Sequence, residues 1–248
     1  MIQRFILFVC TFFLSISSFA QSEVYELRIY DMKFATSEAV LHEYLSDALI
    51  PALNRLGINN VGAFEESGER LPKKIYLLIP YKEMQHYTEV ADELEKDEKF
   101  LTASSEYDKL PAAQIPFERY ESRFIRSSSG FPHLVKPGED LNQFELRIYE
   151  SANEDALRRK LKMFNESEFE IFKNVGLQTV FFGKNISGDQ MPCLTYMLAF
   201  KDKAEHNKSW SGFGQEPEWQ RISKLEEYAN TVSDISRVFL KALPYSQI

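Results

Sequence analysis

The sequence predicts an α+β fold in which two ferredoxin-like βαββαβ modules form a single barrel within one chain. The first observation behind this prediction is a repeat, because the hexapeptide YELRIY at 25–30 returns as FELRIY at 144–149. The second is that further matches follow at the same offset, 144 − 25 = 119 residues. The third is that both copies show the same order of strand and helix patterns, which is the order of the ferredoxin-like unit.

The repeat extends over most of the chain. The offset of 119 relates three further pairs: Gly57 and Gly176, the apolar runs 75–81 and 194–200, and Phe100 and Trp219. Near the end of each copy, Ser122-Arg123 aligns with Ser236-Arg237 after the offset falls to 236 − 122 = 114. Collinear matches of this kind indicate an internal duplication.

Each copy begins with a strand and a helix. In 25–30 apolar and polar residues alternate with a period of two, which is typical of a strand. From Leu41 to Leu56 leucines recur at spacings of three and four, which predicts a helix with one apolar face, and Gly57 ends it as a left-handed cap. The second copy repeats this pattern from 157 to 175, with Gly176 as the cap.

Two strands, a second helical region and a last strand complete each copy. The strands are expected at 60–64, 75–79 and 120–125 in the first copy, and at 179–182, 194–200 and 235–240 in the second. A turn separates the middle strands, at Gly68 or at 187–189. In the second helical region of the second copy, Gly212 and Gly214 predict a break and Pro217 predicts a new helix start.

The chain therefore divides into four segments: a signal peptide at 1–20, a first module at 21–126, a linker at 127–143 and a second module at 144–248. The linker is rich in Ser, Gly and Pro, as connectors are. In each module the helices cover one face of a four-stranded sheet and leave the other bare. Two modules can pack these bare faces together, and the duplication supplies both in one chain.

The N-terminus has the pattern of a secretory signal peptide. Arg4 precedes the apolar run 5–13, and Ser18 and Ala20 place small residues at the positions that determine cleavage. Cleavage after Ala20 would leave Gln21 as the first residue of a secreted or periplasmic protein. The alternative is a membrane anchor, but the run is short for a span and no basic stop follows it.

Composition and charge narrow the function classes. The formal net charge of −8 argues against non-specific nucleic-acid binding and against a polybasic membrane surface. An apolar content of 44% allows a core that needs neither disulfides nor metals to fold. Since Cys10 lies in the signal peptide, Cys193 is the one cysteine of the mature chain, and we expect it to be a buried, unreactive thiol.

The candidate ligand-binding residues are polar positions on the first strand of each copy: Glu26, Arg28 and Tyr30, and Glu145, Arg147 and Tyr149. Residues two apart on a strand share a face. We expect Leu27 and Ile29 to face the helices, which would turn the polar set into the barrel. Charges there must be paired. They are either Glu–Arg ion pairs that seal the barrel, or arginines that hold an anionic or carbonyl group of a ligand.

Other chemical motifs are absent from the sequence. The four histidines, His42, His86, His133 and His206, do not have the spacing of a metal pair, and neither HExxH, GxSxG nor a glycine-rich phosphate loop occurs. We therefore expect no metal and no cofactor, and the catalytic residues, if there are any, stay unidentified. Trp210, Phe213 and Trp219 are interpreted as core packing between helix and sheet.

The chain resembles the NIPSNAP family in the YELRIY and FELRIY strands, in the apolar helices that end at Gly57 and Gly176, and in Trp210 with QEPEW at 215–219. The resemblance implies the dimeric α/β-barrel version of the fold. It implies no catalytic set. The first copy departs from the pattern, because Ala91 stands in the place of Trp210 and Phe100 in that of Trp219, and both copies lack the Pro-Gly that often follows the first strand.

Three functions fit these observations. The first is binding of a small molecule in or beside the barrel, the second is an enzyme of the cofactor-independent oxygenase or isomerase type that this fold often hosts, and the third is a protein-interaction module without a pocket. A cavity lined by Arg28, Arg147 and tyrosines would favour the first two. A filled barrel with an exposed apolar patch would favour the third. A homodimer is compatible with all three.

Overall fold

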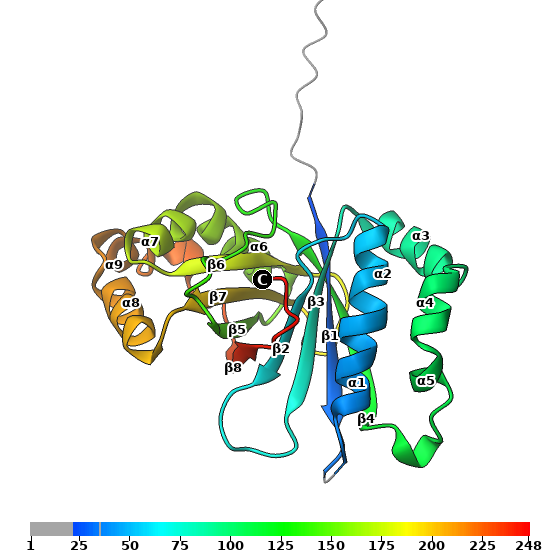
Figure 1. Ribbon diagram of the computed structural model, residues 1–248. Helices are drawn as coiled ribbons and strands as arrows, with labels where there is room; N and C mark the ends of the chain where they lie inside the picture. The colour runs from blue at the N-terminus through cyan, green and yellow to red at the C-terminus, as the bar shows by residue number, and fades with distance from the viewer. Residues whose placement is uncertain (1–21, 35) are drawn as a thin grey trace, which may run out of the picture.

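The computed structural model describes residues 22–34 and 36–248, so the predicted signal peptide lies outside the described residues. Eight antiparallel strands close into one barrel in the order β1-β3-β2-β8-β5-β7-β6-β4. Figure 1 shows the helices of the first module on the right of this barrel and those of the second on the left. The predicted α+β fold of two βαββαβ modules is confirmed.

The first module contains strands β1 to β4, and its two helical regions lie between β1 and β2 and between β3 and β4. The strands are β1 (Val24–Met32), β2 (Gly62–Glu66), β3 (Lys74–Tyr81) and β4 (Phe117–Ser127). The first helical region is α1 (Ala39–Glu43), a π-helical segment η1 (Tyr44–Leu49) and α2 (Ile50–Arg55). The second is α3 (Met84–Leu94), α4 (Glu98–Ala103), α5 (Ser105–Asp108) and the 3₁₀ turn η2 (Ala112–Gln114).

The second module repeats this order, including the π-helical segment. Its strands are β5 (Gln143–Glu150), β6 (Gln178–Asn185), β7 (Cys193–Phe200) and β8 (Asp234–Ala242). Its helices are α6 (Glu154–Met163), the π-helical η3 (Phe164–Glu168), α7 (Phe169–Asn174), α8 (Lys203–Gln215), α9 (Pro217–Ile222) and the 3₁₀ turn η4 (Glu226–Tyr228). Gly57 and Gly176 both have the positive φ of a left-handed cap, +83° and +76°.

Two seams join the modules and close the barrel. The edge strand β2 of the first module pairs with β8 of the second, and β4 pairs with β6. These seams are shorter than the pairings inside each module: Phe64 to Glu66 form one, and Ile125 to Ser127 form the other. Because each module supplies strands to both seams, neither sheet has a free edge.

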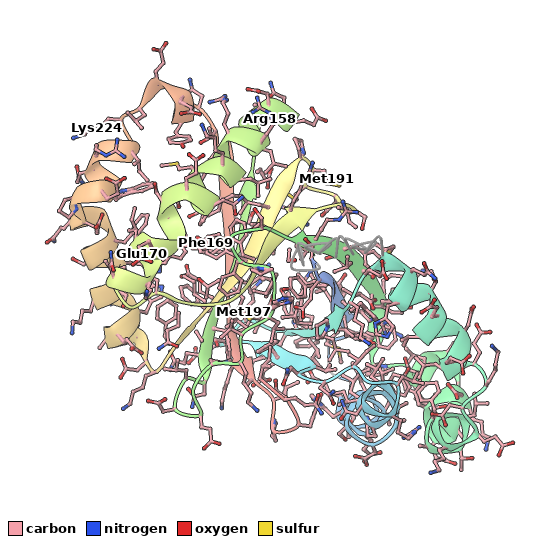
Figure 2. All side chains as sticks on the ribbon, turned by 90° about the horizontal axis from the view of Figure 1, so that it is seen from above. Arg158, Phe169, Glu170, Met191, Met197 and Lys224 are labelled. Carbon is pink, nitrogen blue, oxygen red and sulfur yellow. The ribbon has the colours of Figure 1, made fainter. Side chains whose placement is uncertain are left out.

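The barrel interior is an apolar core shared by both modules. Leu27 and Ile29 of β1 lie in it with Leu146 of β5, Phe181 of β6 and Met197 of β7. Figure 2 shows Met197 in the middle of the molecule, with the helices of the two modules on opposite sides.

The predicted direction of the polar residues is therefore wrong. Alternation along the strand holds, but Glu26, Arg28 and Tyr30 face the helices, as do Glu145, Arg147 and Tyr149. The physical reason is that the meeting of two sheet faces excludes water and favours apolar side chains. The buried Arg123 of β4, opposite Leu27, shares this face and is paired with Glu121 and Asp189. On the other side of the sheets the helices leave β4 and β8 partly uncovered, with Tyr120 and Phe239 about half exposed, at 51% and 46%.

Two local predictions also need correction. Helix α8 does not break at Gly212 or Gly214 but continues to Gln215, and Gly212 lies against Val175. The predicted new start at Pro217 is confirmed, and the carboxylate of Glu216 accepts a hydrogen bond from the Trp219 amide as an N-cap. In the described part of the chain, no helix combines the length and the apolar character needed to cross a membrane.

The alignment of Ser122 with Ser236 is wrong by one residue. Arg28 pairs across the strands with Ser122, and the equivalent Arg147 pairs with Arg237. The structural offset on the last strand is therefore 237 − 122 = 115. A shift of one residue moves a side chain to the other face of a sheet, so Arg237 lies on the helix side, beside the candidate residues of β5.

Candidate functional site

In the first module Glu26 and Arg28 form a closed ion pair. Arg28 donates to both carboxylate oxygens of the fully buried Glu26, with Nε–Oε1 at 2.9 Å and Nη2–Oε2 at 3.1 Å. The hydroxyls of Ser122 and Tyr81 donate to the same carboxylate at 2.8 and 3.3 Å. Burial lowers the pKa of Arg28, but Glu26 and Tyr30 raise it by more, so the pKa is raised overall. Both oxygens of the Glu26 carboxylate thus accept hydrogen bonds, and its charge is balanced by Arg28.

In the second module the same carboxylate is shared among three partners. Glu145 is fully buried, and Arg147 Nη1 donates to its Oε1 at 2.6 Å. The other oxygen, Oε2, accepts from the indole N–H of Trp210 at 2.9 Å and lies 3.1 Å from Nε2 of His206. Glu145 therefore connects a buried arginine to a histidine on α8.

Arg147 consequently has donors that Glu145 does not use. Its Nη2 donates to the Tyr149 hydroxyl at 3.3 Å, which also accepts from the Tyr196 hydroxyl at 2.9 Å. Its Nε is buried and has no hydrogen-bond partner, and the guanidinium lies 4.3 Å from the centre of the Trp210 ring. Burial lowers the pKa of Arg147, while the two tyrosines and Glu145 raise it by more. The group stays charged and incompletely paired.

A second arginine lies directly opposite Arg147. Arg237 on β8 is its cross-strand partner, and its side chain is exposed. Like charges in this relation destabilise a sheet unless something else compensates them. The equivalent pair in the first module is Arg28 and the neutral Ser122. At this position of the two modules, the second has two cations side by side where the first has one; among the described strands another such pair, Arg126 and Lys184, lies across the β4–β6 seam.

A cleft of about 590 Å³ opens between α8 and β8, next to this pair. Its lining combines positive, amide and aromatic side chains with the turn between β2 and β3: Ser67, Gly68, Gln143, Phe144, Phe200, Lys203, His206, Asn207, Arg237, Phe239 and Leu240. No carboxylate is among these lining residues. The ring of His206 contacts those of Phe200 and Phe239, with centroids 4.8 and 5.3 Å apart.

The two modules can be compared at each of these positions. His206 corresponds to Tyr87 (206 − 119), and both rings contact the equivalent phenylalanine of the last strand. The centroid distances are 4.7 Å from Tyr87 to Phe124 and 5.3 Å from His206 to Phe239. The backbone sites are therefore equivalent, and the chemistry differs: the second module has a histidine, a tryptophan and an extra arginine that the first lacks.

The structure therefore divides the six predicted residues between two places. Glu145, Arg147 and Tyr149 meet in the network behind the cleft, while Glu26, Arg28 and Tyr30 form a separate set in the first module. Sequence reasoning missed His206, Arg237 and Lys203. His206 could have been found by aligning the two copies of the repeat, because it stands where the first copy has Tyr87. Arg237 could not, because the last strands were aligned one residue out of register.

A second buried charge pair in the second module joins α6 to η3. Lys160 and Glu168 are both buried and joined by an ion pair, and the ammonium lies 4.7 Å from the centre of the Phe164 ring. The offset of 119 places Leu41 and Leu49 at these positions in the first module, and both are buried there. Burial raises the pKa of Glu168, with Lys160 opposing the rise.

The cysteine and the predicted aromatic group take their expected places in the core. Cys193 is buried at the start of β7, where burial raises the pKa of its thiol to about 11. Phe213 and Trp219 pack with centroids 4.4 Å apart, as predicted for the core, whereas Trp210 also binds Glu145. Among residues 22–34 and 36–248, no group of three or more His, Cys, Asp or Glu side chains could hold a metal ion.

Solved structures share this fold over nearly the whole chain. A protein from Fusobacterium nucleatum named "putative monooxygenase" is 12% identical, with a TM-score of 0.55 over 90% of this chain and 93% of its own. A protein of the same name from Lactobacillus acidophilus is 11% identical, with a TM-score of 0.53 over 89% and 94%. A mutant chlorite dismutase from Candidatus Nitrospira defluvii is 8% identical, with a TM-score of 0.52 over 90% and 92%.

The sequence itself identifies the family. No curated protein matches the chain. A NIPSNAP family protein from Agrobacterium tumefaciens is 17% identical, with a TM-score of 0.36 over 43% of this chain and 93% of its own. The family model of NIPSNAP matches twice, at residues 25–125 and 144–247, and so covers both modules. The chain therefore belongs to the NIPSNAP family and carries two NIPSNAP modules in tandem.

Proposed function

We propose that the chain binds a small anionic molecule in the cleft between α8 and β8. The observation that carries this proposal is that Arg237, which lies directly opposite the buried Arg147, lines the cleft with no carboxylate beside it. Lys203 and His206 line the same cleft, and no carboxylate lines it. Lys203 and Arg237 have no carboxylate beside them in the lining of the cleft, so they are suited to an anion from solution, and arginine suits a carboxylate or phosphate through its planar pair of donors.

The location is beside the barrel, not inside it. Large side chains, among them Tyr25, Phe64 and Phe144, fill the barrel interior, where an anion would lose its hydration without gaining a partner. A filled barrel with Ile235 and Phe239 exposed on β8 at 42% and 46% also fits a protein-interaction module. The cleft favours a small molecule, because Phe239 lines it together with Lys203 and Arg237.

The test is a calorimetric titration with acetate, benzoate, phenylpyruvate and inorganic phosphate at low salt. We expect Arg237→Ser, which installs the residue of the first module, to weaken binding at least tenfold. Arg119→Ser removes the same charge from β4, which lies across the barrel from β8, and should leave binding unchanged. Binding that is absent in the unaltered chain, or equal in both variants, would overturn the proposal.

An enzyme is the second candidate. Two structural neighbours carry the name "putative monooxygenase", but at 12% and 11% identity their likeness concerns the fold alone. The feature of this chain that favours catalysis is the imidazole of His206 in the cleft, which is backed by the buried carboxylate of Glu145.

Export remains a separate proposal. It rests on Arg4, the apolar run 5–13 and the small residues before Gln21. We expect N-terminal sequencing of the secreted or periplasmic protein to begin at or near Gln21. Recovery of the chain from the cytosol with Met1 still in place would contradict export.

A further inference from the structure

We propose that His206 transfers a proton at the carbon next to the carbonyl group of a 2-oxo acid with an apolar side chain. This inference rests on the proposed anion binding, because the same cleft must hold the substrate. It assigns a catalytic role to His206 and a positioning role to Glu145.

His206 is held in one orientation by a buried carboxylate. Its Nε2 lies 3.1 Å from Oε2 of Glu145, which is fully buried and is itself fixed by Arg147 and Trp210. A carboxylate in this position accepts the Nε2 proton and leaves the lone pair of the neutral ring on Nδ1. A base oriented by a buried carboxylate is the arrangement that general acid–base catalysis needs.

The other ring nitrogen of His206 is accessible from the cleft. Nδ1 lies 3.1 Å from the side-chain amide of Asn207, which is an exposed residue that also lines the cleft. With the proton on Nε2, Nδ1 accepts, so the Asn207 amide must be flipped to donate through its NH₂ group, an assignment in which oxygen and nitrogen are interchangeable. This nitrogen is therefore the one that a molecule in the cleft can reach once the amide turns aside. On the other side of the imidazole, Glu145, Arg147 and Tyr149 are hydrogen-bonded to one another and buried, so a molecule in the cleft does not reach them.

The lining of the cleft combines cations with aromatic rings. Lys203 and Arg237 can hold a carboxylate and the negative charge that develops on a neighbouring carbonyl oxygen. Phe200 and Phe239 contact the imidazole and offer an apolar wall for a hydrocarbon or aromatic side chain. Together these groups fit a 2-oxo acid better than a simple carboxylate.

The reaction is a balanced proton transfer. The C–H bond next to the carbonyl breaks and its proton moves to Nδ1. The electron pair of that bond forms a C=C bond, and the π pair of the carbonyl moves to oxygen, which becomes an enolate beside the cations. The imidazolium then returns the proton to carbon or to oxygen, which gives the ketone or the enol. The cycle consumes no oxidant and no cofactor.

The first module provides the comparison within the same molecule. Tyr87 occupies the position of His206, and burial raises the pKa of Tyr87, so it is no base at neutral pH. Ser122 replaces Arg237, and Arg28 commits two donors to Glu26. The same backbone site therefore lacks the base and the extra cation.

The experiment follows loss of the C3 proton signal of phenylpyruvate and of pyruvate in D₂O by ¹H NMR, relative to buffer alone. We expect the unaltered chain to accelerate exchange, and His206→Tyr, the residue of the first module, to reduce that acceleration about 10²–10⁴-fold. Calorimetric binding of phenylpyruvate should change only a few-fold. His86→Tyr, on α3 of the first module, is the matched control and should exchange as the unaltered chain does.

Glu145→Gln tests positioning. With the fold checked by circular dichroism, it should slow exchange and shift the pH profile of the rate while phenylpyruvate still binds. Binding without acceleration, or acceleration undiminished in His206→Tyr, would overturn this inference alone. Absence of binding in the unaltered chain would overturn the proposed function with it.

Discussion

At the scale of single residues, we expect removal of the paired arginine to cost different amounts of stability at Glu26 and at Glu145. Arg28→Met leaves the buried Glu26 with two neutral hydroxyl donors, and we expect a loss of about 3–5 kcal/mol in the free energy of unfolding. Arg147→Met should cost less, because it also removes a buried unpaired Nε and the like charge opposite Arg237. Urea melts at pH 7 measure the loss in each variant, and equal losses in Arg28→Met and Arg147→Met would contradict this prediction.

The buried pair of Lys160 and Glu168 gives a second residue-level prediction. Lys160→Leu strands a buried carboxylate and should cost about 3–5 kcal/mol, whereas Lys160→Leu with Glu168→Leu, which copies Leu41 and Leu49, should be neutral or stabilising by about 1–4 kcal/mol. Thermal melts of the three chains test this. A double variant as unstable as the single one would mean that the charges themselves hold η3 in place.

The pH dependence of the single variant follows from the direction of the shift. Burial raises the pKa of Glu168 above its ordinary value of 4.5, so the folded chain binds more protons than the unfolded chain in that interval. Stability then falls as pH rises through it. Without Lys160 the pKa rises further, and the loss in Lys160→Leu should be larger at pH 8 than at pH 5. A pH-independent loss would contradict this.

The sequence alone predicted which residues share a face and not which way that face points. The two-residue period placed Glu145, Arg147 and Tyr149 together, and they do form one network. The direction was wrong because alternation is the same whichever face meets the second module. His206 could not be singled out, since its partner Glu145 lies 61 residues away and only the fold brings them together.

At the scale of elements, the glycines of α8 give a direct test of helix continuity. Gly214 has open space where a Cβ would be, and the helix runs through it. Gly214→Ala should therefore stabilise the protein by about 0.5–1 kcal/mol, because alanine loses less backbone entropy in a helix. Destabilisation in a thermal melt would indicate a break at this position, as the sequence pattern suggested.

Element order was more predictable from the sequence than element register. Gly57 and Gly176 ended their helices as expected, because a left-handed cap is a local requirement. Gly212 misled because a glycine does not by itself end a helix, and α8 continues through it beside Val175. The match of Ser122-Arg123 with Ser236-Arg237 misled because pairing with β1 and β5 sets the register of the last strands, and dipeptide identity does not.

At the scale of the whole molecule, the two seams make the modules depend on each other. We expect one unfolding transition, because loss of either module exposes both edges and the shared core of the other. Both tryptophans, Trp210 and Trp219, lie in the second module, so their fluorescence reports on that half while circular dichroism reports on the whole. Coincident urea curves are expected, and two separate midpoints would contradict the dependence. Association of two chains into a homodimer stays a prediction, and light scattering tests it by measuring the molar mass in solution.

The covalent link between the halves has a consequence for how the barrel can change over evolutionary time. In a barrel assembled from two identical chains, every substitution appears twice, so a histidine that serves one groove also enters the other. In the tandem chain a substitution is made once. The second module could acquire Lys160 with Glu168, or His206 in the place of a tyrosine, while the first kept its leucines and its closed Glu26–Arg28 pair. One half can thus serve as scaffold while selection acts on the other.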